Sequence, residues 1–163
     1  MRGLSIDSHL AALVGVRGGV LRWREMKQVV TSLSVESRRG LTEITSQVRA
    51  AVRNASVREG ICTVFVRHTS ASLVIQENAD PSVRDDLNAF FDRLVPDGDR
   101  LFTHVLEGAD DMPAHVKAAI LPVSLSIPVR GGELVLGTWQ GVYLWEHRAG
   151  RQRREIVVHV LGE

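Results

Sequence analysis

Apolar residues that recur at every second position constrain the fold of this chain more than any other feature. Residues 121–129 keep this period without a break, and Gly131-Gly132 then leads into the apolar run 134–136. A period of two is typical of a strand with one buried face, and a glycine pair is typical of a tight hairpin turn. Residues 155–161 are apolar on both faces, which indicates a strand inside a sheet or at a subunit contact. The C-terminal third is therefore predicted to be mostly β-structure.

The rest of the chain combines strands with helices. Residues 27–35 and 61–66 have strand patterns, whereas residues 41–52 carry apolar side chains at helical spacing. Asp80 and Pro81 have the residue types of a helix N-cap and first helical position. The next apolar residues predict a helix with one buried stripe, formed by Val83, Leu87, Phe90, Phe91 and Leu94. The element order predicts a single α+β domain, with a largely antiparallel β-sheet and helices packed on one face.

The N-terminal segment has a different character. Residues 9–16 predict a short helix that glycines soon end, and an arginine-rich stretch follows. A clean strand pattern begins directly after Met26. We therefore expect residues 1–25 to be an N-terminal extension outside the core, and residues 26–163 to form the domain.

Composition narrows the class of protein. A hydrophobic fraction of 44% and a charged fraction of 24% are typical of a soluble globular domain. A net charge of +1 gives no argument for a nucleic-acid partner, and no run approaches the roughly 20 apolar residues of a membrane helix. The single cysteine, Cys62, has no internal disulfide partner, and its apolar surroundings predict a buried side chain. We expect a cytoplasmic protein with neither a nucleic-acid nor a membrane partner.

Polar residues gather where a strand ends and the second helix starts. A helix start offers free backbone N–H groups, so it is a natural place for an anionic or metal-bound ligand. Arg67 or Arg84 adds a positive charge suited to phosphate. An ordinary strand–turn–helix junction has the same appearance, so both readings stand. The polar residues in question are His68, Thr69, Ser70, Glu77, Asn78 and Asp80.

A second informative stretch spans residues 103–119. Asp111 and His115 are four positions apart, so both can face one side of a short helix. A carboxylate at that spacing can fix the tautomer of a working histidine. The alternative is that Asp111 only caps the helix and His115 is a surface residue.

Histidines make metal binding one candidate chemistry. Four of the six are candidates, and most of these lie near acidic or hydroxyl residues: His68, His104, His115 and His147. Three imidazoles, or two with a carboxylate, suit zinc or a similar divalent ion with an open coordination position. A third reading needs no chemistry, because the aromatic strand from Trp139 to Trp145 and the apolar last strand can form contacts of a homo-oligomer.

Four motifs in register resemble the YjbQ family from Met26 onward. They are HTSASL at 68–73, ENADPSVRDDL at 77–87, EGADDMPAHVK at 107–117 and GTWQGVYLWEHR at 137–148. The resemblance implies a compact α+β domain assembled as a homotrimer. It also implies a weak thiamine-phosphate synthase activity, which joins pyrimidine diphosphate and thiazole phosphate precursors.

The family's polar signature carries over to positions of this chain. Together with the residue patterns, it predicts a catalytic group of His68, Glu77, Asn78, Asp80 and Asp111. The predicted contacts to a small phosphorylated substrate are Thr69, Ser70, Arg84, Trp139, Gln140 and Glu146. The predicted metal ligands are His68, His104, His115 and His147.

The predicted cofactor is a divalent metal ion, zinc or magnesium. A synthase that releases pyrophosphate usually uses Mg²⁺, whereas imidazole ligands favour zinc. Two other functions remain open. One is a metal-dependent hydrolase of a small phosphate or acyl substrate, and the other is a trimeric binding protein without turnover.

Overall fold

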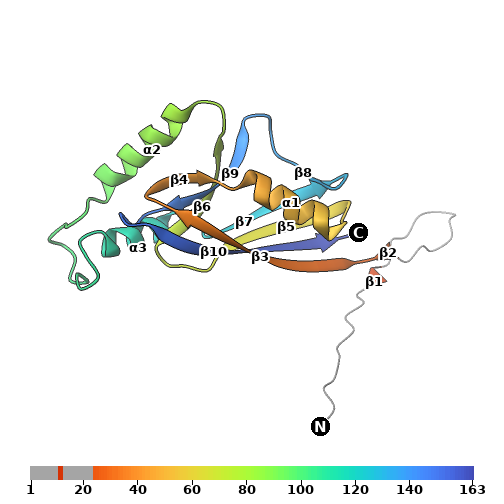
Figure 1. Ribbon diagram of the computed structural model, residues 1–163, viewed down its shortest axis with the longest axis horizontal. Helices are drawn as coiled ribbons and strands as arrows, with labels where there is room; N and C mark the ends of the chain where they lie inside the picture. Colours follow the sequence, from red (N-terminus) through yellow and green to blue (C-terminus); the bar gives the residue numbers. More distant parts are fainter. Residues whose placement is uncertain (1–10, 13–23) are drawn as a thin grey trace, which may run out of the picture.

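The computed structural model describes residues 11–12 and 24–163, which form antiparallel sheets and helices in an α+β arrangement (Figure 1). In chain order the elements are β1 (Ala11–Ala12), β2 (Arg24–Glu25), β3 (Lys27–Ser37), β4 (Gly40–Glu43), α1 (Thr45–Ala55), β5 (Glu59–Val66), β6 (Ala71–Glu77), α2 (Pro81–Leu94), α3 (Asp111–Ile120), β7 (Ser124–Arg130), β8 (Glu133–Leu134), β9 (Gln140–Glu146) and β10 (Gln152–Gly162). The predicted α+β fold with largely antiparallel pairing is confirmed.

The main strands divide between two sheets. The larger sheet has the order β3-β10-β5-β7-β8, and the smaller has the order β4-β9-β6. β10 pairs with β3 on one side and with β5 on the other, which agrees with its apolar pattern on both faces. Its inward side chains, such as Ile156 and Val158, are fully buried.

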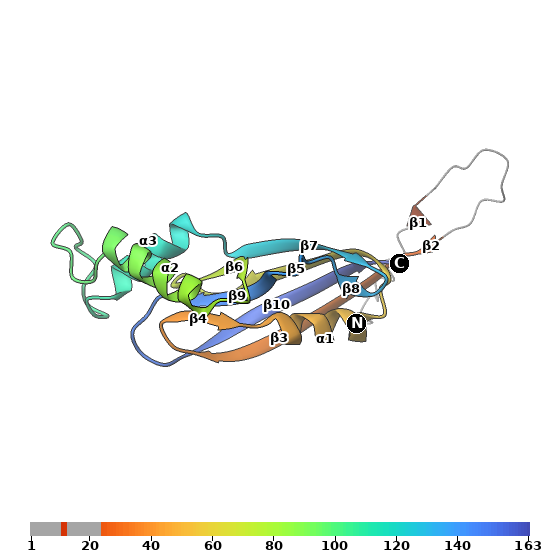
Figure 2. The ribbon, with the colours of Figure 1, turned by 90° about the horizontal axis from the view of Figure 1, so that it is seen from above.

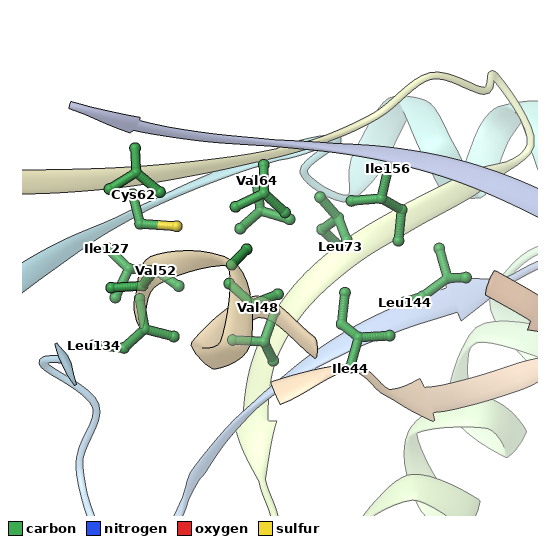
Figure 3. Packing of buried hydrophobic residues seen from close by; sticks show 14 of the residues in the cluster. Ile44, Val48, Val52, Cys62, Val64, Leu73, Ile127, Leu134, Leu144 and Ile156 are labelled. Atoms are coloured by element: carbon green, nitrogen blue, oxygen red, sulfur yellow. The ribbon is translucent and has the colours of Figure 1, made fainter. Parts of the chain in front are cut away.

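The core lies between the two sheets and is closed by α1 (Figure 3). Val48 and Val52 of α1 pack in one cluster with Cys62 and Ile127 of the large sheet and with Leu144 of the small sheet. Apolar burial of this kind is the dominant stabilising term in folding. Cys62 is fully buried as predicted, and burial raises the pKa of its thiol to about 11. The Cys62 side chain is therefore a core hydrophobe and not a nucleophile.

Helix α2 covers the outer face of the small sheet. The Asp80 side chain accepts a hydrogen bond from the Ser82 N–H at 2.8 Å, and Pro81 occupies the first turn, as predicted. Leu87 and Phe91 pack against a cluster that includes Trp145.

The prediction of one buried stripe on α2 is wrong for two of its five apolar residues. Phe90 and Leu94 are 49% and 55% exposed. The small sheet is three strands wide and covers only one side of the apolar arc.

The N-terminal helix prediction is wrong where it can be compared. Ala11 and Ala12 pair with Glu25 and Arg24 in an antiparallel ladder, so their backbone groups bond across strands. The other residues of the predicted helix over 9–16, and most of the proposed extension 1–25, lie outside the described residues. Within the described part of the chain, no helix is both long enough and apolar enough to span a bilayer.

Candidate metal centre

Three side chains that can bind a metal meet at the start of α3. Asp111 and His115 lie one helical turn apart on this helix, and His104 comes from the connection that precedes it. One ligand atom from each side chain lies within 4.8 Å of the other two. The His104 and His115 ring centres are 5.7 Å apart. The predicted proximity of Asp111 and His115 is therefore present, and His104 completes the cluster.

Hydrogen bonding orients the His115 ring toward this cluster. Its Nδ1 lies 3.0 Å from the Thr69 carbonyl oxygen, which can only accept, so Nδ1 carries the proton. In the tautomer with its single proton on Nδ1, the ring presents a lone pair at Nε2, 3.6 Å from Asp111 Oδ2. Two acceptors facing each other at this distance repel unless a proton or a metal ion lies between them. A histidine whose second nitrogen is held by a backbone carbonyl is the usual arrangement of a metal ligand.

Asp111 is held from its other side. The carboxylate is buried, and its Oδ1 accepts a hydrogen bond from Arg148. The Oδ2 atom lies 2.8 Å from His104 Nε2 and faces the histidines. One carboxylate oxygen is thus held by Arg148, and the other lies against His104 Nε2, from which a bound metal ion would displace the shared proton.

The Arg148 side chain links Asp111 to Asp110 and to the backbone of Glu107. Its Nε donates to Asp110 Oδ2 at 3.0 Å, and a second nitrogen donates to the Glu107 carbonyl at 2.8 Å. Burial alone would raise the pKa of Asp110, but the Ala149 N–H and Arg148 hold that pKa below its usual range. Asp110 is therefore an anion at neutral pH and fixes the arginine that orients Asp111.

His68 lies beside this cluster but does not belong to it. A pocket of about 600 Å³ is lined by His68, Arg67, Thr69 and His115, with apolar side chains around them. His68 Nε2 accepts a hydrogen bond from the Glu155 N–H at 2.9 Å, and burial, then Arg154, lower the pKa of the ring. The described cluster consists of His104, Asp111 and His115 without His68, so the role of His68 as a metal ligand stays a prediction.

His147 is also not a ligand in this geometry. Its ring is buried beside Trp145, and its Nε2 lies 2.9 Å from Ser72 Oγ. Burial lowers the pKa of His147 to about 4, so the ring is neutral at pH 7 and shares a hydrogen bond with the serine hydroxyl. The alternation of β9 places His147 on the same face as Trp145, beneath the helices.

The polar cluster at the start of α2 lies away from the histidines. α2 has 14 residues and is therefore about 21 Å long, with this cluster at its N-terminal end and α3 near its other end (Figure 1). Within one chain, the predicted catalytic group is thus divided between two places. The residues at the start of α2 are Glu77, Asn78, Asp80 and Arg84, with Trp139 and Gln140 beside them.

Local contacts explain the side chains at the start of α2. Asp80 caps the helix, and Glu77 accepts a hydrogen bond from the Asp80 N–H at 3.3 Å. The Asn78 side chain donates to the Gln140 carbonyl at 3.4 Å. A shallow pocket of about 470 Å³ lies beside them, with exposed Trp139 on its wall. These contacts are structural, and the pocket remains a separate candidate for binding.

Glu146 is not placed to contact a substrate. It is fully buried and accepts hydrogen bonds from two nitrogens of Arg154, both at 2.6 Å. Ser37 Oγ and the Arg148 N–H also donate to it. Ser70 is buried as well, and its hydroxyl accepts from Arg154 at 3.0 Å. Both residues support the site from within, whereas Thr69 lines the pocket beside His115.

Sequence reasoning missed Arg148 and Arg154. Arg154 shares the inward face of β10 with Ile156, Val158 and Val160. A charged residue in an inward position of an apolar alternation was the available signal, because a buried charge requires a partner. Arg148 carried no comparable signal, since it lies in a polar connection.

Comparison with known proteins gives consistent matches. A model of the UPF0047 protein YjbQ-like family matches residues 30–163. The UPF0047 protein of Synechocystis sp. is 54% identical over 125 residues, which cover 77% of this chain and 85% of that protein. YjbQ of Salmonella typhimurium is 44% identical over 129 residues, or 78% and 93% of the two chains. A YbjQ-like protein of unknown function from Sulfolobus solfataricus has a crystal structure that matches with a TM-score of 0.77 at 33% identity, covering 85% of this chain and 99% of that one.

The buried His147 predicts a pH-dependent stability. The folded-state pKa of about 4 is below the ordinary value of 6.5, so the unfolded chain binds this proton first as the pH falls. Above pH 6.5 the neutral ring contributes on the order of 3 kcal/mol to the free energy of unfolding, and this contribution is lost as the pH falls from 6.5 to 4. Urea titrations at pH 7 and pH 4 measure the free energy of unfolding. Between these two pH values it should fall less in His147→Gln than in the unmodified protein. An equal loss of stability in the two proteins would contradict a buried neutral ring at His147.

Proposed function

The chain belongs to the UPF0047 family of YjbQ-like proteins, and we propose that it is a metal-dependent enzyme acting on a small phosphorylated substrate. The observation that carries the proposal is the orientation of His115, whose Nδ1–H donates to Thr69 while Nε2 faces Asp111. His104 Nε2, His115 Nε2 and Asp111 Oδ2 are the atoms that would hold the ion.

The ligand set supports zinc more than magnesium. Two imidazoles and one carboxylate are a common protein contribution to a zinc site with an open position, whereas magnesium prefers oxygen ligands in an octahedron. When bound, a divalent ion supplies positive charge that can neutralise a phosphate oxygen or acidify a water molecule. The chain's own part is to fix the ligands, through Thr69 on His115 and Arg148 on Asp111.

The pocket beside His115 supplies room for a substrate. Its volume of about 600 Å³ falls within the range of small-molecule sites. Arg67 and Thr69 offer donors on its wall, and Phe65 and Val123 offer apolar contact. A phosphorylated substrate with an aromatic part fits this mixture of cationic and apolar surface.

Two reactions compete for this site. Coupling of the pyrimidine diphosphate and thiazole phosphate precursors into thiamine phosphate rests on the family resemblance. Hydrolysis of a small phosphate or acyl substrate is favoured by the ligand set itself, which resembles that of zinc enzymes with an open position. A binding protein without turnover is the third reading.

Metal binding is expected to depend on the three clustered side chains. The His115→Ala and Asp111→Asn variants should each bind zinc at least about tenfold more weakly, because each removes a ligand atom. Isothermal titration of metal-stripped protein measures this, and circular dichroism checks that the variants fold. His68→Ala is the matched control, because its ring lines the adjoining pocket outside the cluster. Unchanged zinc affinity in His115→Ala would contradict the proposed site.

The reaction test supplies the purified protein with the two thiamine precursors, with zinc, with magnesium and after chelation. We expect thiamine phosphate to form only with metal, and to fall by at least about 100-fold in His115→Ala. A panel of phosphate monoesters and acyl esters tests hydrolysis in parallel. Hydrolysis without coupling would replace the synthase by the hydrolase, and metal-independent turnover unaffected by His115→Ala would contradict both.

Assembly as a homotrimer remains part of the proposal. The outer face of the large sheet is not covered by the helices, and Val30, Ile61 and Phe65 on it are 60%, 41% and 43% exposed. Exposed apolar side chains on one face of a sheet are typical of an interaction site. A second and a third copy of the chain are the occupants that the family resemblance implies.

Light scattering after size exclusion tests the assembly. The expected mass is three times that of the 18.0 kDa chain, and Ile61→Glu should reduce it by placing a charge on the uncovered face. Leu94→Glu, which alters an exposed apolar residue on α2 and not on the large sheet, is the control. A monomeric protein, or an assembly that tolerates Ile61→Glu, would contradict this interface.

A further inference from the structure

A second pocket lies between the β3–β4 turn and the start of β10. It has a volume of about 610 Å³ and is lined by Arg38, Arg39 and Arg151, together with Glu36, Ser37, Leu41 and Thr42. The views in Figure 1 and Figure 2 place the β3–β4 and β9–β10 connections at the same end of the molecule as α3. None of the lining residues belongs to the histidine cluster or to the pocket beside it.

The positive charge in this pocket is only partly neutralised. Arg39 donates to Asp97 at 2.7 Å, but its Nε–H is buried without an acceptor. Glu36 lies 3.9 Å from Arg153, so it already has a cationic neighbour. Among residues 24–163, neither Arg38 nor Arg151 forms an ion pair or a side-chain hydrogen bond. Two exposed guanidinium groups, those of Arg38 and Arg151, therefore remain available to an anion.

The walls of the pocket are held in place by buried contacts. Glu146 accepts a hydrogen bond from Ser37 Oγ on the β3–β4 side at 2.8 Å and from the Arg148 N–H on the β9–β10 side at 2.9 Å. Gly40 has a φ of +111°, a conformation that side chains disfavour, and an added Cβ would lie 3.0 Å from Asn88 Nδ2. The turn that carries Arg38 and Arg39 is thus fixed before any ligand binds, which lowers the entropic cost of binding.

We propose that this pocket binds the phosphate group of a small phosphorylated molecule. Guanidinium groups match phosphate because their planar N–H pairs can donate two parallel hydrogen bonds. The volume exceeds that of a phosphate ion, and Leu41 and Thr42 offer the organic part of the molecule a wall. The site is independent of the metal centre, so its test needs no enzymatic activity.

The experiment uses the full chain, stripped of metal and labelled with 15N-arginine. Inorganic phosphate and pyrophosphate are titrated at constant ionic strength while the Nε–Hε signal of Arg39 is followed. We expect a saturable shift with both probes. The Arg38→Gln/Arg151→Gln double variant should weaken the affinity by about tenfold or more, and Arg130→Gln should leave it unchanged. Arg130 is an exposed control at the opposite end of the large sheet.

Three results would overturn the proposal. A shift of equal size with chloride at the same ionic strength would show screening in place of a site. Equal affinity in the double variant and the unmodified protein would show that Arg38 and Arg151 do not bind the phosphate. Saturable binding of a single-stranded oligonucleotide without binding of either phosphate probe would show a polyanion surface in place of a small-molecule site. The far-ultraviolet circular dichroism of the double variant checks that its two exposed substitutions leave the fold intact.

Discussion

A buried ion pair between Arg154 and Glu146 holds together the end of the molecule where both candidate sites lie. The two side chains are 6% and 0% exposed, and two Arg154 nitrogens donate to the two Glu146 oxygens. Burial alone would raise the pKa of Glu146, but Arg154, the Arg148 N–H and Ser37 keep that pKa below its usual range. Removing one partner of such a pair leaves a buried charge, which typically costs about 3–5 kcal/mol. The pair is therefore a structural requirement of the sites.

Hydrogen bonds from this pair lead to the residues that orient the ligands of the candidate metal centre. Arg154 reaches Ser70, and the neighbouring Thr69 carbonyl fixes the tautomer of His115. Glu146 holds the Arg148 backbone, while the Arg148 side chain orients Asp111. The metal centre is thus a set of ligands whose positions are determined by buried partners. A ligand atom that is already oriented loses little freedom when it binds, and second contacts of this kind strengthen metal sites.

The sequence identified most of the elements but not their partners. Two element predictions are wrong: the helix over 9–16 where it can be compared, and the start of the first helix, because residues 41–43 belong to β4. Periodicity identified the strands, and residue type identified the α2 cap at Asp80, because both depend on neighbours in the chain. The spacing of Asp111 and His115 predicted their shared face for the same reason. Whether an imidazole faces a ligand site depends on contacts distant in sequence, so His147 was misjudged: its Ser72 partner comes from another strand. Periodicity likewise identified the apolar arc of α2 without showing that the small sheet leaves Phe90 exposed.

The central claim is that His104, His115 and Asp111 together bind a divalent metal. X-ray absorption spectroscopy of the zinc-loaded protein in solution tests it most directly, because it identifies the ligand types around the ion. Our account predicts two imidazole nitrogens and at least one oxygen in the first coordination shell, with one imidazole lost in His104→Ala and one in His115→Ala. A shell without imidazole, or one that is unchanged in both variants, would contradict it.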